Sequence, residues 1–351
     1  MNFASDNVHG VDDAILDALR DANGGTARAY GYDPLTAAAE QRLRDVFGCD
    51  LAAYLVVTGT AANSLALAAC CPPYGAVICH AEAHITTDEC GAPELYTGGA
   101  KLMGVRGPAC KLTPAAVTAM LATMGRGEHE QRPHVLSLAN ATELGTAYTP
   151  AEVAALSTLA RERGLRVHMD GARFANAVAR QGCTPAELSW QAGVDVLSFG
   201  ATKNGALGVE AVVFFDKALA DDFVYLRKRT GQLVSKSRFL AAQILAYLEG
   251  DRWLANARRA NAAADRLAAG LAGLAGVRLP LPVDANAVFA IVPRALHEHL
   301  LAGGARYLVW PGEGPGTDVV GPGEVFIRLL TSFRTTDADV DALVALAARR
   351  G

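Results

Sequence analysis

The chain has 351 residues, of which 51% are hydrophobic and 19% charged, and its formal net charge at pH 7 is −4. This length allows a large and a small lobe with separate cores, and the charge gives no electrostatic reason to expect nucleic acid or an anionic membrane as a partner. No apolar run is long enough for a transmembrane helix, and the first residues lack the pattern of a signal peptide, so we expect a cytoplasmic protein.

Short apolar runs alternate with helical patterns from about residue 30 to 240. This alternation predicts an α/β fold with a mostly parallel sheet and helices on both faces. Two of the helices are expected after Thr113-Pro114 and Thr149-Pro150, where threonine caps the helix and proline takes the first turn. The expected strands are 54–58, 76–80, 101–105, 134–138, 165–170, 194–199 and 211–215.

The pattern changes near residue 240. Long helical stretches at 238–248 and 253–274 are followed by expected strands at 287–292 and 325–330. We therefore expect a large domain of residues 1–240 and a small α+β domain of residues 241–351. The glycine- and proline-rich run 310–316 is expected to be a loop.

Lys203 and Asp170 are the pair of residues that predicts chemistry. Asp170 ends one apolar strand, and Lys203 follows the next in a turn of small residues. A lysine that forms a Schiff base, together with an acid that keeps a pyridine nitrogen protonated, is the minimum protein equipment of pyridoxal-phosphate chemistry. Taken alone, Lys203 could be a solvated loop lysine, and Asp170 could form an ordinary salt bridge with Arg173.

Two further motifs fit the same cofactor. Thr58-Gly59-Thr60 follows a strand and opens a helix, where free backbone N–H groups bind an anion; a plain helix cap is the alternative. His84 lies in a loop, where its ring could lie flat against an aromatic cofactor or be a structural histidine. Neither a GxGxxG nor a Walker motif is present, so a dinucleotide-dependent oxidoreductase is unsupported.

Cysteine spacing does not indicate a metal site or a disulfide framework. The seven cysteines are odd in number and show no CxxC spacing, so we expect reduced packing thiols and no metal. They are Cys49, Cys70, Cys71, Cys79, Cys90, Cys110 and Cys183.

These features resemble a known family, the low-specificity L-threonine aldolases of the β-eliminating lyase group. The family has the aspartate-aminotransferase fold, known as pyridoxal-phosphate fold type I, and the Thr-Lys-Asn-Gly around Lys203 is similar to its phenylserine-active bacterial branch. The resemblance covers nearly the whole chain. Its marks are Phe3-Ala-Ser-Asp-Asn7, Ala29-Tyr-Gly-Tyr-Asp33, Thr58-Gly-Thr-Ala-Ala-Asn63, Ala83-His84, His168-Met-Asp-Gly-Ala-Arg173, Gly200-Ala-Thr-Lys-Asn-Gly205 and Ile327-Arg-Leu-Leu-Thr331.

The resemblance implies how pyridoxal 5'-phosphate is held. Lys203 is expected to carry the cofactor as a Schiff base, Asp170 to pair with the pyridine nitrogen, and His84 to stack on the ring. Gly59 and Thr60 are expected to bind the phosphate. Arg173 and Asn140 complete the expected cofactor contacts of this subunit.

The resemblance also implies substrate contacts and shared sites. Ser5, Arg173 and Arg328 are expected to grip the substrate carboxylate. Tyr30 is expected to reach the cofactor or substrate, with a subunit interface as one possible route. Lys236 is expected to bind the phosphate of a neighbouring subunit, in a homotetramer built as a dimer of dimers.

The implied reaction is retro-aldol cleavage of L-β-hydroxy-α-amino acids, such as L-threonine, L-allo-threonine and phenylserine, to glycine and an aldehyde. His84, His129 and a bound water all remain candidates for the base that removes the β-hydroxyl proton. Three alternative functions remain open: a β-eliminating lyase, an aminotransferase of the same fold, and a cofactor-binding protein without catalysis.

Overall fold

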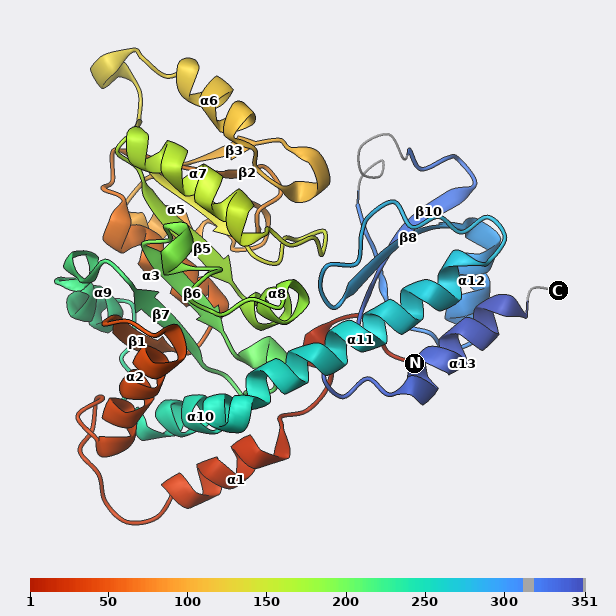
Figure 1. Cartoon of the computed structure of the whole chain (residues 1–351), viewed down its shortest axis with the longest axis horizontal. Coiled ribbons are helices and arrows are strands. Elements are labelled where there is room, and N and C mark those ends of the chain that lie inside the picture. Colours follow the sequence, from red (N-terminus) through yellow and green to blue (C-terminus); the bar gives the residue numbers. More distant parts are fainter. Residues whose placement is uncertain (312–318, 350–351) are drawn as a thin grey trace.

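A computed structural model describes residues 1–311 and 319–349, so the run expected to be a loop at 310–316 lies partly outside the described residues. A seven-stranded sheet with the order β1-β7-β6-β5-β4-β2-β3 forms the centre of the large lobe (Figure 1). All pairings among β2 to β6 are parallel, whereas β7 is antiparallel to both of its neighbours. The predicted α/β fold with a mostly parallel sheet is thus confirmed. The strands are β1 (Ala52–Val56), β2 (Gly75–His80), β3 (Lys101–Val105), β4 (Arg132–Ala139), β5 (Arg166–Gly171), β6 (Val196–Gly200) and β7 (Glu210–Phe214).

Helices cover both faces of this sheet because its strands are apolar on both sides. Within β7, Val212 and Phe214 pack with α3 and α9, whereas Ala211 and Val213 belong to the core on the opposite face. This alternation is the two-residue period of a strand buried on both faces. The helices of the large lobe are α1 (Asp13–Ala22), α2 (Pro34–Phe47), α3 (Gly59–Cys70), α4 (His84–Thr87), α5 (Ala92–Thr97), α6 (Pro114–Ala122), α7 (Pro150–Glu162), α8 (Phe174–Gln181), α9 (Phe223–Arg229) and α10 (Arg238–Leu248).

Capping residues set where the chain leaves the sheet. The Thr58 hydroxyl accepts a hydrogen bond from Ala61 N, so α3 begins at Gly59 and β1 ends before the predicted strand 54–58 does. The predicted threonine cap of α7 is confirmed and is part of a capping box, in which Thr149 accepts from Glu152 N and Glu152 accepts from Thr149 N. Because the strands run parallel, the loops that follow their carboxyl ends lie at one edge of the sheet.

The small lobe contains an antiparallel sheet with the order β8-β10-β9 and is joined to the large lobe by the long helix α11 (Figure 1). Phe3 lies in the core of this lobe, and α10 packs in the core of the large lobe. The change between the two cores falls within α11, later than the predicted boundary at residue 240. The elements are α11 (Arg252–Ala272), β8 (Ala287–Pro293), α12 (Arg294–Ala302), β9 (Leu308–Val309), β10 (Glu324–Leu330) and α13 (Asp337–Ala348).

The two lobes meet through a small apolar cluster. Cys110 and Leu144 of the large lobe pack against Phe289, Phe326 and Leu330 of the small sheet. Within β10, Val325, Ile327 and Leu329 instead face the core of the small lobe. The face of β10 that carries Phe326 and Leu330, and with them residue 328, is therefore the face turned toward the large lobe.

All seven cysteines are free. None of the helices in the described part of the chain combines the length and apolarity needed to cross a membrane.

Candidate active site

Five of the predicted cofactor residues meet in one cavity at the carboxyl edge of the sheet. The cavity has a volume of about 200 Å³. Of the residues singled out in the sequence, Gly59, His84, Asp170, Arg173 and Lys203 line it. They come from the start of α3, the start of α4, the end of β5, the start of α8 and the turn after β6, which all lie at the edge where ligands collect in such sheets.

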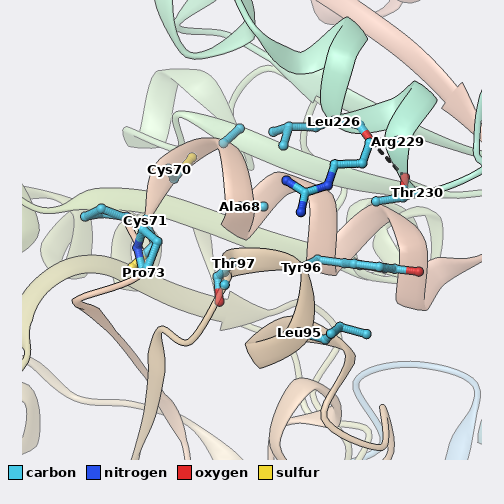
Figure 2. A pocket seen from close by; sticks show the side chains of 13 residues that line it. Ala68, Cys70, Cys71, Pro73, Leu95, Tyr96, Thr97, Leu226, Arg229 and Thr230 are labelled. Carbon is cyan, nitrogen blue, oxygen red and sulfur yellow. Dashed lines mark hydrogen bonds between the residues drawn. The ribbon is translucent and has the colours of Figure 1, made fainter.

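A larger hollow, of about 670 Å³, lies between the end of α3 and the helices α5 and α9 (Figure 2). Tyr96 and Leu226 flank it, and Arg229 is the charged side chain among the residues that line it. It contains no acid that could partner a pyridine nitrogen and no lysine. The smaller cavity around Lys203 is therefore the candidate active site.

Asp170 is held as a buried carboxylate. Its Oδ1 accepts from Ala172 N at 2.9 Å, and its Oδ2 accepts from Asn63 Nδ2 at 2.8 Å. Burial on its own would raise the pKa of Asp170, but the charge of His84, these hydrogen bonds and the charge of Lys203 outweigh it and hold the pKa below its usual value. An ionised carboxylate on the cavity wall is what a protonated pyridine nitrogen requires.

His84 is oriented by a second buried acid. Its Nδ1 lies 2.8 Å from Glu89 Oε1, which also accepts from Asn63 Nδ2 at 2.9 Å. A carboxylate can only accept, so Nδ1 carries the hydrogen and Nε2 is left free to accept a proton. The hydrogen bond to Glu89 raises the pKa of His84 despite the opposing effect of burial. The backbone N–H of His84 donates to Glu143 at 2.8 Å.

Lys203 lies in a single 3-10 turn, Thr202–Asn204, that is held in place by hydrogen bonds of Asn204. The amide of Asn204 donates to Tyr247 Oη and to the carbonyl of Trp253, both at 2.8 Å. The lysine itself has no hydrogen bond or ion pair within the described residues. The positive charge of Arg173, and then burial, lower the pKa of Lys203, as a nucleophilic amine requires.

The structure adds Asp6 to the predicted carboxylate grip. Arg173 Nε donates to Asp6 Oδ2 at 2.7 Å and Arg173 Nη2 to Asp6 Oδ1 at 3.2 Å. Asp6 is buried and also accepts from Asn286 Nδ2 at 3.2 Å. Arg173 therefore reaches the cavity with two of its three guanidinium nitrogens already bound, so that Nη1 is the one without a partner.

Arg328 is the second predicted carboxylate ligand, and no acid among the described residues lies within ion-pair distance of it. Its guanidinium lies over the ring of Trp310, 4.7 Å from the centroid, and its buried Nε has no hydrogen-bond partner. Burial, and then the charge of Arg173, lower the pKa of Arg328 to about 10. The charges of Arg173 and Asp6 both act on Arg328, so the two arginines from the two lobes belong to one cluster of charges.

Asn140, Thr60 and His129 are not brought to the cavity of their own chain. Both ends of the Asn140 amide bond the backbone of Tyr148, so this side chain closes a loop, and it does not line the cavity. Thr60 lies in the first turn of α3, but Thr58 and Gly59 line the cavity instead. His129 is exposed in a turn just before β4, at the edge of the sheet opposite Lys203.

Ser5, Tyr30 and Lys236 also lie outside the cavity lining of their own chain. The Ser5 hydroxyl accepts from Asn7 N at 3.1 Å, and Asn7 does line the cavity. Tyr30 is exposed beside Lys228, and its backbone N–H donates to Ser235 O, one residue before Lys236. The segments of Tyr30 and Lys236 therefore lie side by side at the surface.

The lining fits pyridoxal phosphate as a set of donors. It supplies a free amine at Lys203, an ionised carboxylate at Asp170, an imidazole at His84 and a helix N-terminus at Gly59. A Cβ added to Gly59 would meet no atom within 4 Å, so the space in front of this helix end is open. Together with the sheet order, these residues define an enzyme of pyridoxal-phosphate fold type I.

Comparison with known proteins supplies the family. Residues 2–295 match the beta-eliminating lyase family, so the chain belongs to this family of pyridoxal-phosphate enzymes. The low specificity L-threonine aldolase of Pseudomonas aeruginosa is 48% identical over 312 residues, which is 89% of this chain and 90% of that one. The corresponding aldolase of a Pseudomonas species is 44% identical over 343 residues, 98% and 96% of the two chains.

Solved structures agree with this assignment. The threonine aldolase of Leishmania major matches with a TM-score of 0.91 and 28% identity, over 99% of this chain and 98% of that one. A serine palmitoyltransferase with pyridoxal phosphate matches with a TM-score of 0.72 and 18% identity, over 99% and 86%, and shows the fold alone. The predicted fold type and cofactor are confirmed.

The sequence patterns do not indicate a role for four acids and one amide at or behind the cavity, although Asp6, Asn63 and Glu89 stand within or beside the motifs described above. These residues are Asp6, Glu89, Glu143, Glu210 and Asn63. For Glu89, the spacing of five residues after His84 is the sequence feature that could have indicated its contact with that histidine. Glu143 and Glu210 reach the site only through the packing of distant segments.

Proposed function

We propose that this chain is a low-specificity L-threonine aldolase, which cleaves L-β-hydroxy-α-amino acids to glycine and an aldehyde. The observation that carries the proposal is the combination of two arginines and a His84–Glu89 dyad around Lys203. The arginines suit an α-carboxylate, and the dyad suits a β-hydroxyl. The relatives that share most of the length of the chain bear this activity in their names.

The arginines would fix the substrate through its carboxylate. Among the described residues Arg328 forms no ion pair and Nη1 of Arg173 has no hydrogen-bond partner, so together the two arginines would offer a charge-assisted grip from both lobes. Binding by both lobes would orient the Cα–Cβ bond of the substrate relative to His84. Asp6 keeps Arg173 in place while the substrate enters.

His84 would act as the base for the β-hydroxyl proton. Glu89 holds Nδ1–H, so Nε2 accepts the proton, and the ionised Glu89 stabilises the positive imidazole that results. Asp170 would keep its negative charge beside the pyridine nitrogen. Pyridoxal phosphate, when bound, supplies the electron sink that makes breaking a Cα–Cβ bond feasible.

The proposal extends to assembly and location. Tyr30 and Lys236 are exposed and adjacent, and neither lines the cavity of its own chain, which supports contacts to a site on a second subunit in a dimer of dimers. Seven free cysteines support a reducing, cytoplasmic location. Sedimentation of the enzyme tests the assembly: a monomer with full activity would contradict shared sites.

Product analysis tests the activity. L-threonine, L-allo-threonine and phenylserine should each give glycine and the matching aldehyde, whereas pyruvate or a keto acid would indicate a β-eliminating lyase or an aminotransferase instead. Lys203→Ala should abolish cleavage and the visible absorbance of the bound cofactor. Lys217→Ala, which removes a surface lysine paired with Asp50, is the matched control and should retain both. An active, yellow Lys203→Ala enzyme would refute the assignment.

A further inference from the structure

Glu210 is a buried acid of the active-site cavity that the mechanism above does not use. It lies on β7, opposite Gly200 in the register of β6 and β7, and it lines the same cavity as Lys203. Its side chain is 7% exposed, and its Oε2 accepts from the backbone N–H of Ala201 at 2.7 Å. Glu210 therefore holds the strand end from which the Lys203 turn begins.

A carboxylate is not needed for that structural contact. A glutamine at residue 210 would offer an oxygen acceptor to Ala201 N at nearly the same volume, without the cost of burying a charge. Glu210 has no ion pair within 4.0 Å among the described residues, so its charge is not offset by direct contact with a cation. Lys203 is the cation whose charge acts on it through space.

We propose that Glu210 is a positioning residue whose negative charge stabilises the protonated nitrogen of Lys203, and so sets the pH range over which that nitrogen keeps its proton. The inference rests on the proposed function only in that Lys203 carries the cofactor. It concerns the charge behind the lysine, and it does not depend on which bond of the substrate is broken.

Lys203 is the cation of the cavity wall that has no acid of its own among the described residues, because Arg173 is paired with Asp6 and His84 with Glu89. Among the elements packed around Glu210, β6 carries no ionisable side chain and α3 carries only Cys70, at its far end. β1 contributes Tyr54, which lies opposite Val212, and α10 contributes Tyr247, whose hydroxyl bonds Asn204. Neither tyrosine is charged at neutral pH, because nearby burial raises the pKa of both.

Glu210 changes its charge near neutral pH. Burial raises the pKa of Glu210 to about 7, since hydrogen bonds from Thr202 and Ala201 and the charge of Lys203 only partly offset the lost hydration. Its negative charge is therefore present mainly above neutral pH. Arg173 and burial lower the pKa of Lys203, and the charges of Asp6, Asp170 and Glu210 act in the opposite direction. Glu210 differs from the two aspartates in having a raised pKa.

The experiment is a pH titration of the visible absorbance of the holoenzyme without substrate. Glu210→Gln keeps the acceptor for Ala201 N and removes the charge. We expect the titration midpoint to fall by about 1 pH unit or more, the lower end of the effect of a close opposite charge. Glu143→Gln is the matched control: Glu143 is also a glutamate that lines the cavity, but its charge is not among the main causes of the pKa shift of Lys203. Its midpoint should stay within about 0.3 units.

Each outcome decides the proposal. An unmoved midpoint in Glu210→Gln, or an equal shift in both variants, would overturn it. Failure of Glu210→Gln to fold with its cofactor, checked by circular dichroism, would also count against it, because the hydrogen-bonding role would then require the acid itself. If threonine is not cleaved but the midpoint moves as expected, the proposed function fails while the role of Glu210 stands.

Discussion

Replacing Asp6 by asparagine tests how much the buried ion pair with Arg173 holds the site together. Asp6 is 4% exposed and accepts hydrogen bonds from Arg173 at 2.7 and 3.2 Å and from Asn286 at 3.2 Å. It thereby ties together the N-terminal segment, the start of α8 and the segment before β8. Asparagine keeps nearly the same volume and one oxygen acceptor but removes the charge.

The expected loss is set by burial. Removing one partner from a buried ion pair costs about 3–5 kcal/mol, because the remaining charge is left without compensation. Since asparagine still accepts one hydrogen bond, we expect a loss near the lower end of this range, about 3 kcal/mol in the free energy of unfolding. The pair of Asp13 and Arg334 is the matched control: its atoms are 2.8 Å apart, but the Asp13 side chain is 84% exposed. Asp13→Asn should cost less than about 1 kcal/mol.

Urea unfolding of the wild type and both variants measures this difference, and its pH dependence provides a second check. Burial raises the pKa of Asp6, but the charges of Arg173 and Lys203 and the hydrogen bonds from Arg173 and Asn286 outweigh it and lower the pKa from 3.8. The stabilisation is therefore fully present above the unfolded pKa and is lost as the pH falls through the lower folded value. The gap between wild type and Asp6→Asn should narrow only in acid below about pH 4. Equal losses for Asp6→Asn and Asp13→Asn would refute the reasoning from burial.

Two further substitutions test the neighbours of His84 and Lys203. Glu89→Gln removes the main cause of the raised pKa of His84. The acid limb of the pH profile of kcat/KM should therefore move to lower pH, and the plateau of kcat/KM should fall about tenfold or more. An unchanged profile would show that the His84–Glu89 dyad takes no part in the mechanism. Gly200→Ala places a Cβ 2.6 Å from the carbonyl oxygen of Ala172. It should lower the free energy of unfolding by about 1–3 kcal/mol, measured by thermal unfolding, and weaken cofactor binding, measured by titration. Gly273→Ala, which meets no atom within 4 Å, is its control, and equal behaviour of the two variants would contradict the packing argument.

Local sequence patterns predicted the fold and five of the residues that line the cavity around Lys203. The strand of Asp170 and the turn of Lys203 are short motifs whose position at the end of a parallel strand fixes where their side chains lie. Asn140 stands at the same kind of strand end, yet its amide closes a loop onto Tyr148, because strand position does not determine which of several partners a side chain bonds. His129 matched by spacing alone, and the turn before β4 carries it to the opposite edge.

Contacts between distant segments could not be read from the sequence. Asp6 meets Arg173 across 167 residues, and Asn63 meets Asp170 across 107 residues. The packing of α10 is a further example: its sequence reads as the start of a new helical region, but its apolar face is buried with that of α2. Such pairings depend on how helices and lobes pack, which a single sequence does not specify by local periodicity.

The four buried acids nearest the cofactor cavity divide into two kinds, and the division explains how the site can take an anionic ligand. Asp170 and Asp6 accept from donors near cationic groups, and their pKa values are lowered. Burial raises the pKa values of Glu143 and Glu210, whose hydrogen-bond donors are neutral. If all four were fully ionised, they would oppose a phosphate and a carboxylate in the same small volume. Because the pKa values of both glutamates are raised, the negative charge that is present at every pH near neutral is that of Asp6, which faces Arg173, and of Asp170, which faces the predicted pyridine nitrogen. A pair of acids whose environments separate their pKa values is the usual sign of divided roles in catalysis. Here the division follows from the nearby cations: Arg173 and Lys203 act on Asp6, and His84 and Lys203 act on Asp170, whereas Lys203 only partly offsets the burial of Glu210.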